Sequence, residues 1–430
     1  MNFIKLSMAT FVATACLIST AYARNGEFCE LAESALYKNY NLESIRQQLN
    51  ASDERIIQSK NVNGPKLTLL GNLLAYSEEQ GSTNITNNAT LALSYSQTLY
   101  DSGLNDARLG QANGNKQLLN LDLAAGSRDT IVEVARAYVN FVKNIQLLSL
   151  GRKNLGNINE QLHNVEDKFA ASEATQQELS LVKSRVRQAT SNMLRAKAEV
   201  LLSRVKLMAL TNKEAIGDDS GFMKSLLTNI PSSSSAAIET ARANSIEIDK
   251  TGIAIDVAQF EIAAQEASLG ANVQVTASFG FGKVDDDTGV ASRVGLALNL
   301  PLYSSGVLES KVREAKATLA AARARRAFMT ELSKQNVRVA FEITKSIQQS
   351  LAILPEAIRE QEAAIASLEQ SLARSFISTA DVLLAKNSVF ELRKSLVQLR
   401  FERYSSNLEL LNSIGKLQSV ASLNTVGLCK

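Results

Sequence analysis

The sequence predicts a mainly α-helical chain with a small membrane-spanning β part, in which one unit of two strands and a very long helix occurs twice. Three observations predict this fold class. The 430 residues include only 4 Pro and no Trp, and residues such as Ala, Leu, Gln and Glu, which lose little rotamer freedom in a helix, are abundant. The motif LYDSG at residues 99–103 recurs as LYSSG at residues 302–306, an offset of 203 residues. Before each copy, apolar residues alternate with polar ones.

The N-terminus has the pattern of a secretory signal peptide over residues 1–23. Lys5 supplies a positive charge, residues 8–18 are apolar, and the AYA sequence at residues 21–23 fits a cleavage site. One alternative is a single membrane anchor, although the apolar run is shorter than the roughly 20 residues of a span. Another is a lipoprotein cleaved before Cys16. An exported chain without a spanning helix is either soluble or crosses a membrane with strands.

Two cysteines follow the signal, Cys29 and Cys429, at opposite ends of the mature chain. Because an exported protein meets an oxidising compartment, a disulfide that ties the two ends together is one interpretation. The other is two unrelated thiols, since the sequence does not show whether their Cβ atoms are close. The formal net charge of +3 favours neither sign strongly, so it indicates no nucleic-acid partner.

The offset of 203 residues relates further segments and predicts a duplication. We expect a first structural repeat at residues 24–212, a Gly-, Asp- and Ser-rich linker at residues 213–235, a second repeat at residues 236–417 and a tail at residues 418–430. Besides the two motifs, the offset aligns Leu91, Leu93, Tyr95, Phe169, Ser172, Thr175, Glu178 and Lys183 with Val294, Leu296, Leu298, Leu372, Ser375, Ser378, Asp381 and Lys386.

Each repeat begins with a predicted helix and continues with two alternating strands of about 9–11 residues, the length of a tilted membrane-spanning strand. The alternative is a soluble hairpin with one buried face. Four strands are too few for a barrel, and an open edge in lipid is forbidden, so several chains would have to share one. Three chains would supply twelve strands. The predicted helices are residues 30–60 and 236–267, the strands are residues 66–76, 90–99, 272–281 and 294–302, and the polar tips are residues 77–88 and 284–289.

A very long helix follows each pair of strands, over residues 104–170 and 307–373. At ~1.5 Å per residue each is roughly 100 Å long, and the first has apolar residues at heptad spacing. Pro355 is expected to kink the second helix or to open a turn. The return helix over residues 176–211 is about 54 Å long, so it and the helix before the strands together nearly match the long helix.

The turns into the return helices carry two sequences of the capping-box type, Thr175-x-x-Glu178 and Ser378-x-x-Asp381. Their equivalent positions place both at hairpin tips far from the strands. One interpretation is that they are helix caps and nothing more. The other follows from symmetry, because three copies of Asp381 or Glu178 around one axis would form a carboxylate ring that attracts cations.

With these features the chain resembles the TolC-like outer-membrane factor family. The resemblance rests on the signal, the duplication, two hairpins, the TLYDSG and PLYSSG turns, and the stretch ISTADVLLAKNSVF…LLNSIG within residues 377–415. It implies a homotrimer whose long helical hairpins form an α-barrel continuous with a twelve-strand β-barrel, four strands per protomer. Such a channel spans the outer membrane of a Gram-negative bacterium, extends into the periplasm and contacts outer-membrane lipid. It is the passive exit duct of a tripartite efflux or type I secretion system.

The resemblance also implies that a periplasmic adaptor and an inner-membrane transporter dock at the helical tips. Asp381 matches an aspartate that narrows the closed entrance, whereas Leu384 stands where well-known members carry a second aspartate. A glycine common at these tips is replaced by Ser172 and by Ser375. The pore or gate candidates are Asp381, Glu178 and Leu384, and the docking candidates are Phe169, Ser172, Thr175, Leu372, Ser375 and Ser378.

Two other classes of function remain as alternatives. A periplasmic coiled-coil adaptor would have one hairpin beside a lipoyl-like β domain, and a filament or surface protein would not need apolar-faced strands of this length. An enzyme is not expected, because His163 is the only His and no CxxC or phosphate-binding loop occurs. We therefore expect no cofactor and no metal. The cargo is not indicated by the sequence.

Overall fold

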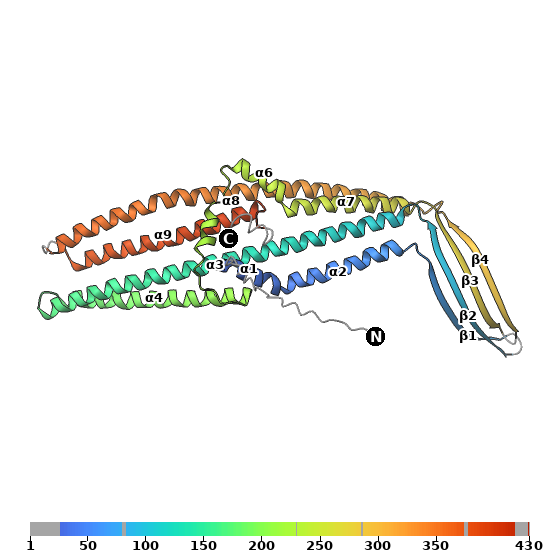
Figure 1. The fold of residues 1–430 in the computed structure, drawn as a ribbon, viewed down its shortest axis with the longest axis horizontal. Helices are drawn as coiled ribbons and strands as arrows, with labels where there is room; N and C mark the ends of the chain where they lie inside the picture. The colour runs from blue at the N-terminus through green and yellow to red at the C-terminus, as the bar shows by residue number, and fades with distance from the viewer. Residues whose placement is uncertain are drawn as a thin grey trace, which may run out of the picture.

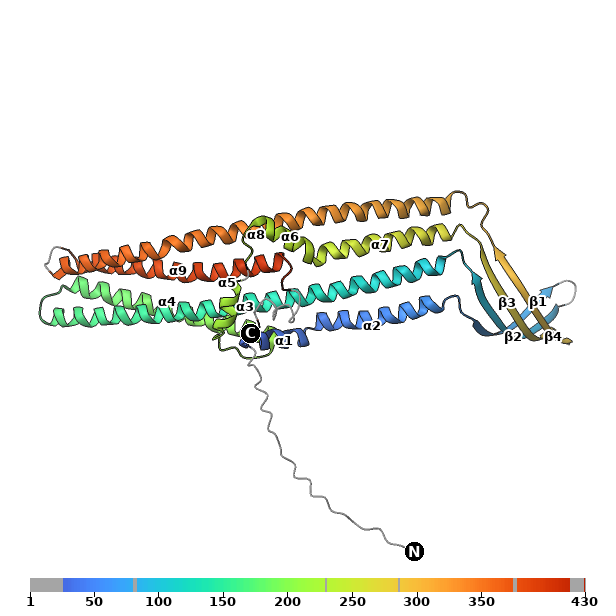
Figure 2. The same cartoon turned by 45° about the horizontal axis from the view of Figure 1, so that its top comes forward.

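The structure is a computed structural model that describes residues 26–79, 83–228, 230–284, 287–373, 377–417 and 429. The predicted signal peptide and most of the predicted tail lie outside these residues, and so does Ser375. The described chain is long and thin. Long helices run side by side over most of its length, and a sheet continues from one end at an angle to them (Figures 1 and 2).

The order of elements is nearly the same in the two halves, with helices, two strands, a long helix and a return helix in each. The first half contains α1 (Glu27–Lys38), α2 (Tyr40–Asn61), β1 (Lys66–Glu79), β2 (Thr83–Tyr100), α3 (Leu104–Ala170) and α4 (Gln176–Thr211). The second contains α6 (Ser234–Asn244), α7 (Ile246–Ala267), β3 (Asn272–Val284), β4 (Asp287–Asn299), α8 (Val307–Ala373) and α9 (Thr379–Ser413), and α5 (Ser220–Thr228) lies between the halves.

The long helices α3 and α8 each have 67 residues and begin and end where the sequence predicts. Pro355 lies inside α8, which continues on both sides of it, so the expectation that it opens a turn is wrong. A proline removes one backbone hydrogen bond, whereas α9 packs along α8 beyond it, as the 2.7 Å ion pair between Glu362 and Arg393 shows. In the part of the chain that is described, no helix is long and apolar enough to cross a membrane.

The first predicted helix, residues 30–60, is divided into α1 and α2 at Asn39. The Asn39 side chain accepts hydrogen bonds from the N–H groups of Asn41 (2.9 Å) and Leu42 (3.3 Å), so it caps the start of α2. Its amide nitrogen also donates to Thr130 Oγ1 of α3 at 2.8 Å. The capping residue therefore holds the junction of α1 and α2 beside Thr130 of α3.

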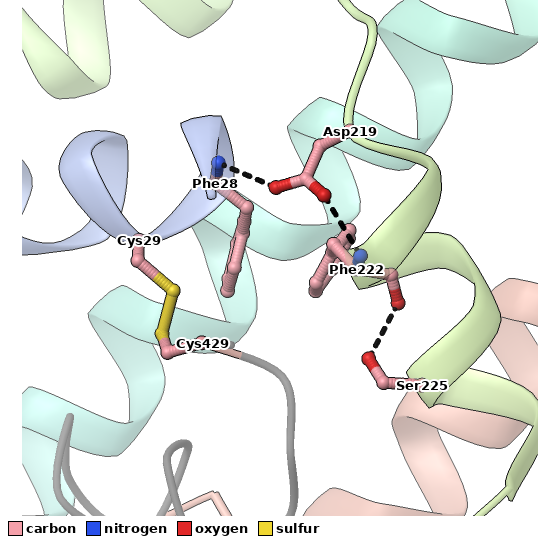
Figure 3. The surroundings of a disulfide bond; sticks show 6 residues. All are labelled: Phe28, Cys29, Asp219, Phe222, Ser225 and Cys429. Atoms are coloured by element: carbon pink, nitrogen blue, oxygen red, sulfur yellow. Dashed lines mark hydrogen bonds between the residues drawn. A yellow bond between two sulfur atoms is a disulfide. The ribbon is translucent and has the colours of Figure 1, made fainter. Parts of the chain in front are cut away.

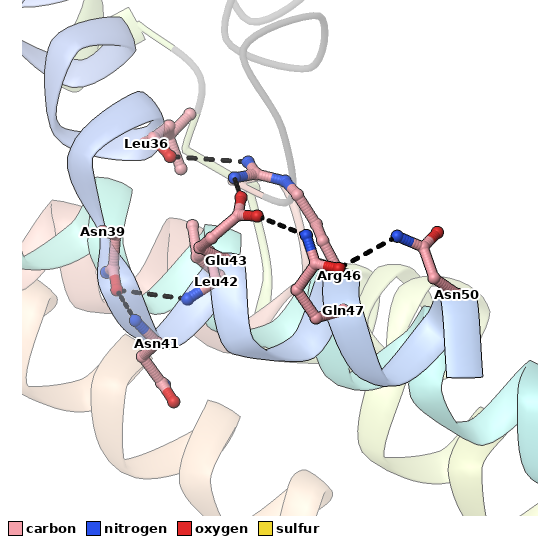
Figure 4. A network of polar contacts seen from close by, with 8 residues as sticks. All are labelled: Leu36, Asn39, Asn41, Leu42, Glu43, Arg46, Gln47 and Asn50. Carbon is pink, nitrogen blue, oxygen red and sulfur yellow. Dashed lines mark hydrogen bonds and ion pairs between the residues drawn. The ribbon is translucent and has the colours of Figure 1, made fainter. Parts of the chain in front are cut away.

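A network of polar contacts joins the end of α1 to the first turns of α2 across this break (Figure 4). Glu43 accepts hydrogen bonds from Arg46 at 3.3 Å and from Gln47 at 2.8 Å, and Arg46 donates to the Leu36 carbonyl oxygen at the end of α1. In the second half, Ser245 separates α6 from α7 and accepts from the Ile248 N–H at 3.3 Å. The prediction of one helix at the start of each repeat is thus wrong, because a capping side chain interrupts each of them.

The strands form one antiparallel sheet in the order β1-β2-β3-β4. At the ends that face away from the helices the strands are longer than predicted. Most residues of the expected polar tips therefore belong to strands. β4 ends at Asn299, so Leu300 and Leu302 lie outside it. The prediction was too short because alternation of apolar and polar residues shows only the part of a strand that has an apolar face. The backbone hydrogen bonds between strands continue through polar residues.

The two faces of this sheet differ in character. Directly paired residues share a face, as Leu69, Leu93 and Phe279 do across β1, β2 and β3. On the other face lie mostly small and polar residues, among them Ser94, Ser278 and its β4 partner Arg293. The large apolar residues of the first face are exposed, and they are Leu67, Leu69, Leu73, Leu91, Leu93, Phe279, Phe281, Val290, Val294, Leu296 and Leu298. An apolar patch of this kind marks a contact surface.

The main core lies at the middle of the molecule, where α1, α3, α5 and α9 meet. The rings of Phe28 and Phe222 stack with centroids 3.8 Å apart, and Tyr138 packs edge-on against both. Asp219 caps α5 by accepting from the Phe222 N–H at 2.8 Å and accepts from the Phe28 N–H at 3.1 Å (Figure 3). Part of the segment between the repeats is therefore packed into the core.

Tyr138 connects the same segment to the start of the chain. Its hydroxyl donates to Glu27 at 2.7 Å and accepts from the Asp219 N–H at 3.0 Å. Glu27 also accepts from the N–H groups of Gly217 and Asp218. Burial raises the pKa of Tyr138, and its hydrogen bond to Glu27 raises it further, so the hydroxyl stays protonated and remains a donor.

A disulfide joins Cys29 of α1 to Cys429, whose Cα atoms are 5.5 Å apart (Figure 3). The two residues are 400 positions apart in the sequence, so the bond connects the two ends of the described chain beside the aromatic core.

We expect Cys29→Ser to lower the free energy of unfolding by about 2–4 kcal/mol, because the bond restricts the unfolded chain by closing a very long loop. The measurement is the thermal unfolding midpoint of the purified protein in detergent. The control is the double variant Cys29→Ser/Cys429→Ser, which should lose no more than the single variant because both lack the same bond. Equal midpoints for the native protein and the single variant would contradict the prediction.

Candidate functional site

Two helical tips lie at the end of the molecule opposite to the sheet (Figures 1 and 2). The first connects α3 to α4 and the second connects α8 to α9. They bring together most of the residues that the sequence singles out. Of the second tip, residues 374–376 lie outside the described residues.

The first tip closes α3 with a left-handed serine. Ser172 has φ +61°, and its N–H donates to the Phe169 carbonyl oxygen at 3.0 Å. The next N–H, that of Glu173, donates to the Lys168 carbonyl oxygen at 2.7 Å. This is the helix ending that usually contains glycine, because a Cβ atom is disfavoured in the left-handed region. The substitution of serine for glycine leaves the turn formed here.

Both predicted capping boxes are formed. At the first tip, Glu178 N–H donates to Thr175 Oγ1 at 3.2 Å and the Thr175 N–H donates to the Glu178 carboxylate at 2.9 Å. At the second, the Asp381 N–H donates to Ser378 Oγ at 3.3 Å and the Ser378 N–H donates to the Asp381 carboxylate at 3.1 Å. Each box satisfies backbone donors that a helix start leaves unpaired.

Among the described residues, one hydrogen bond joins the two tips. Thr379, the first residue of α9, donates from its hydroxyl to Glu178 Oε1 at 2.9 Å. Sequence patterns did not indicate Thr379, because the bond runs between the two repeats and local spacing carries no signal for it. Beside it an apolar cluster continues the contact between the tips, formed by Val165, Leu179, Val182 and Leu383.

The two acidic candidates therefore have different surroundings. Glu178 is partly buried and holds both its own cap and Thr379. Asp381 is exposed and bonded only within its own cap among the hydrogen bonds described, and Leu384, one turn further along α9, is 55% exposed. The exposed pair is thus available to a neighbour or to a pore, whereas Glu178 is occupied in holding the tips together.

Hydrogen bonding holds both carboxyl groups in their charged form. The Thr175 N–H, followed by the Thr379 hydroxyl, lowers the pKa of Glu178. The Ser378 hydroxyl, followed by its N–H, lowers the pKa of Asp381.

The remaining docking candidates are unevenly exposed. Phe169, at the end of α3, is 38% exposed. Thr175 and Ser378 are exposed, and Leu372 is half-buried. Among the described residues of the tips, Phe169 and the hydroxyl groups of Thr175 and Ser378 are thus exposed.

Ion pairs brace each hairpin below its tip. Lys183 pairs with Glu166 at 3.4 Å, and Lys386 pairs with Glu369 at 2.7 Å, at positions that the offset of 203 relates. All four side chains are partly exposed, so each pair contributes at most about 1 kcal/mol. In the described ranges no group of three or more His, Cys, Asp or Glu side chains is placed to hold a metal ion.

Comparison with known proteins gives a consistent result. The family model "Outer membrane efflux protein" matches residues 31–213 and 237–416. The outer membrane efflux protein BepC of Brucella suis biovar 1 (strain 1330) is 23% identical and covers 94% of this chain and 90% of its own. The outer membrane protein TolC of Vibrio cholerae serotype O1 (strain ATCC 39315 / El Tor Inaba N16961) is 22% identical over 97% of both chains. A crystal structure of CusC has the same fold, with a TM-score of 0.79 at 15% identity over 90% of this chain and 92% of CusC.

Replacing Thr379 with Val removes the hydrogen bond between the tips and leaves the shape of the side chain nearly unchanged. We expect the backbone amides of residues 175–182 to exchange with solvent roughly 3- to 10-fold faster, the equivalent of about 1 kcal/mol for one hydrogen bond to a charged group near the surface. Hydrogen exchange read by mass spectrometry measures this. Thr190→Val is the control, because its hydroxyl bonds only to the Val186 carbonyl oxygen of its own helix; equal acceleration in both variants would contradict the assignment.

Acid should loosen the tips. Because the pKa of Glu178 in the folded chain is lowered from its ordinary value of 4.5, its contribution to stability is complete above about pH 4.5 and is lost as the pH falls through the lowered value. Exchange at the first tip, corrected for the intrinsic pH dependence of the chemistry, should therefore be flat from pH 7 to 5 and rise below pH 4.5. Glu178→Gln should abolish most of that rise, and an unchanged rise in this variant would exclude Glu178 as its cause.

Proposed function

Because the chain belongs to the outer membrane efflux protein family, whose model matches both of its halves, we propose that it is the passive exit duct of a tripartite efflux or type I secretion system. Membership of this family makes the chain an outer-membrane channel of a Gram-negative bacterium, and not an enzyme. The exit-duct proposal is supported by the relatives named above, which include an outer membrane efflux protein and TolC.

The observation that carries the proposal is a four-strand sheet with one apolar face and two terminal strands, β1 and β4. In hydrocarbon an unpaired strand edge is forbidden, because each unsatisfied backbone group costs several kcal/mol. A neighbouring copy that adds its β1 to this β4 pairs one edge, and a closed ring of copies pairs both edges of every chain. Three copies supply twelve strands, and the homotrimer is our proposed assembly.

The helices fit the same assembly. Each chain contributes two hairpins, α3 with α4 and α8 with α9, so three chains give a wall of twelve helices below the sheet. The small and polar face of the sheet, with Ser94, Ser278 and Arg293, then lines the lumen, while the apolar face meets outer-membrane lipid. This division is the usual one for membrane barrels.

The tips are our proposed docking surface for a periplasmic adaptor and, through it, for an inner-membrane transporter that supplies the energy. Phe169 and the exposed hydroxyl groups of Thr175 and Ser378 are the groups that a partner would contact. No observation favours the alternative of a periplasmic adaptor, since both halves match one family of outer-membrane proteins.

At the periplasmic entrance we propose a single ring of three Asp381 carboxylates. Asp381 is exposed at the tip and has its pKa lowered, so it is charged at neutral pH. Leu384 follows it by one turn on the same exposed side, which leaves the entrance without a second acidic ring.

The function is tested by transport and conductance together. In a strain that lacks its own exit duct, expression of this chain with its cognate pump and adaptor should restore efflux, and the purified protein should form ion-conducting pores in planar bilayers. A protein that partitions into the soluble periplasmic fraction and forms no pores would exclude the channel.

Substitutions at the entrance test the acidic ring. Asp381→Asn should weaken block of the pore by divalent cations several-fold, because the three negative charges that attract the cation are lost. Leu384→Asp should strengthen it by adding a second ring. Asp218→Asn, in the middle of the chain, is the matched control and should leave block unchanged. If Asp381→Asn and the control behave alike, Asp381 does not face the entrance.

A further inference from the structure

A hollow lies on the surface of α3 where the break between α1 and α2 meets the end of α4, and we name it the junction hollow. Its volume is about 510 Å³, within the range of roughly 300–1,000 Å³ that small-molecule sites occupy. The buried side chains of Ala35 and Val134 form its base. Its rim is formed by exposed polar side chains, which are Lys38, Tyr40, Asn41, Glu133 and Asn212.

The internal repeat produces a second hollow at the equivalent place, beside the break between α6 and α7. The offset of 203 residues converts Glu133 and Asn212 into Asn336 and Gly415, which line the second hollow. Asn212 and Gly415 both follow the end of a return helix and have φ +53° and +73°. The two hollows therefore share one backbone arrangement and differ in their side chains.

The charged groups of the second hollow are neutralised within the chain. Glu247 pairs with Arg128 at 3.6 Å and with Lys250 at 3.8 Å. Glu409 pairs with Arg136. A charged ligand would have to displace these pairs before it could bind there.

The polar side chains of the junction hollow are not used in this way. Lys38, Asn41, Glu133 and Asn212 are exposed, and none of their side chains makes a hydrogen bond or an ion pair with the residues that the structure describes. Asn39 also lines the hollow, but its amide caps α2 and bonds to α3 (Figure 4). Four side chains with free donors and acceptors thus surround one hollow.

Two exposed tyrosines stand beside these groups. Tyr40, the first residue of α2, lines the hollow and is 91% exposed. Tyr37, in the last turn of α1, is 83% exposed. The residue equivalent to Tyr40 at the start of α7 is Ile246, which is only 4% exposed. A tyrosine ring offers a rigid apolar face and a polar hydroxyl group to a ligand.

We propose that the junction hollow binds a glycan strand, with the ring of Tyr40 stacked on one sugar ring. A pyranose ring has a flat face of C–H groups and a rim of hydroxyl or acetamido groups. The Tyr40 ring matches that face. The side chains of Asn41, Glu133 and Asn212 match the rim, because together they offer hydrogen-bond donors and acceptors. Lys38 adds a positive charge, which favours a glycan that carries carboxylate groups.

The position of the hollow along the molecule indicates which glycan it meets, and this step rests on the proposed function. Thr130, which lines the hollow, lies 26 residues after Leu104 at the start of α3, so about 40 Å separates it from the sheet. The hollow borders α1, which belongs outside the bore because a helix inside would obstruct transport. It then faces the periplasm, out of reach of lipid headgroups. The large glycan of that space is the cell wall, an acidic amino-sugar polymer.

Three copies of the chain would place three junction hollows around one channel. A single exposed sugar site binds weakly, because few ligand atoms are buried. A polymer that occupies two or three sites on one particle is held far more tightly, since the second contact is intramolecular. The cell wall would therefore hold the channel at a fixed depth, while the bore stays open for transport.

Sedimentation with insoluble cell wall tests the site. Full-length protein in mild detergent is mixed with purified cell-wall sacculi, and the bound fraction is measured after centrifugation. We expect the native protein to bind. Tyr40→Ile, which introduces the residue of the second hollow, should weaken binding roughly 3- to 10-fold, whereas Tyr40→Phe keeps the ring and should retain most of it. Absence of binding by the native protein, or equal binding by all three proteins, overturns the proposal.

The internal repeat supplies a matched control. Glu133→Ala removes one carboxylate from the junction hollow and should weaken binding. Asn336→Ala, at the equivalent position of the second hollow, should not. Equal effects of the two substitutions would contradict the assignment of the site.

The chemistry of the ligand is tested with altered sacculi. Sacculi stripped of their peptides by an amidase should bind as well as intact ones, and soluble N-acetylglucosamine oligosaccharides should compete. Binding that disappears with the peptides would assign the hollow to a peptide ligand and overturn the glycan.

Pore formation and trimer stability separate this site from the proposed function and from a contact with a second copy. Tyr40→Ile should conduct ions in planar bilayers like the native protein, and its trimer should dissociate at the same temperature. A lower dissociation temperature with unchanged sacculus binding would assign Tyr40 to a contact between copies and overturn the glycan site. Native pores without sacculus binding overturn the glycan site alone, whereas a native protein that forms no pores overturns the channel.

Discussion

The unpaired edges of β1 and β4 are the constraint on which the rest of the structure depends. The four strands form one sheet whose large apolar residues lie on one exposed face, so the sheet is built for an environment without water. In that environment the backbone groups of both edges need partners, and a single chain has none to offer them. In the proposed trimer, closure of the sheet by further copies also sets the geometry below it, because the helices that follow each strand pair belong to the same ring.

The main core at the middle of the molecule holds the helices of the two halves together. Each long helix runs its full length without a break, whereas the shorter helices beside it end near its middle. There the Asn39 cap, the hydrogen bonds of Tyr138 and Asp219, and the Cys29–Cys429 disulfide hold α1, α5 and the end of the chain against α3. The tips are therefore far from both the sheet and this core, and are joined to each other by the Thr379–Glu178 bond and a small apolar cluster.

Helix ends were predictable where a local pattern determines them. The bounds of α3, α4 and α8 follow from the long Pro-poor runs and the capping boxes, and the strands follow from alternation in their apolar part. The breaks at Asn39 and Ser245 were missed, because either residue is tolerated inside a helix and the sequence does not show that its side chain caps the next helix. The packing of Phe222 and the Thr379–Glu178 bond were missed because both join segments that are distant in sequence.

The central claim is that the four-strand sheet of this chain closes into a barrel only together with the sheets of two further copies. The native mass of the protein, extracted from outer membranes in mild detergent, tests it most directly. The account predicts a particle that contains three chains and no smaller folded species. A folded particle that contains a single chain, with its strands intact, would contradict it.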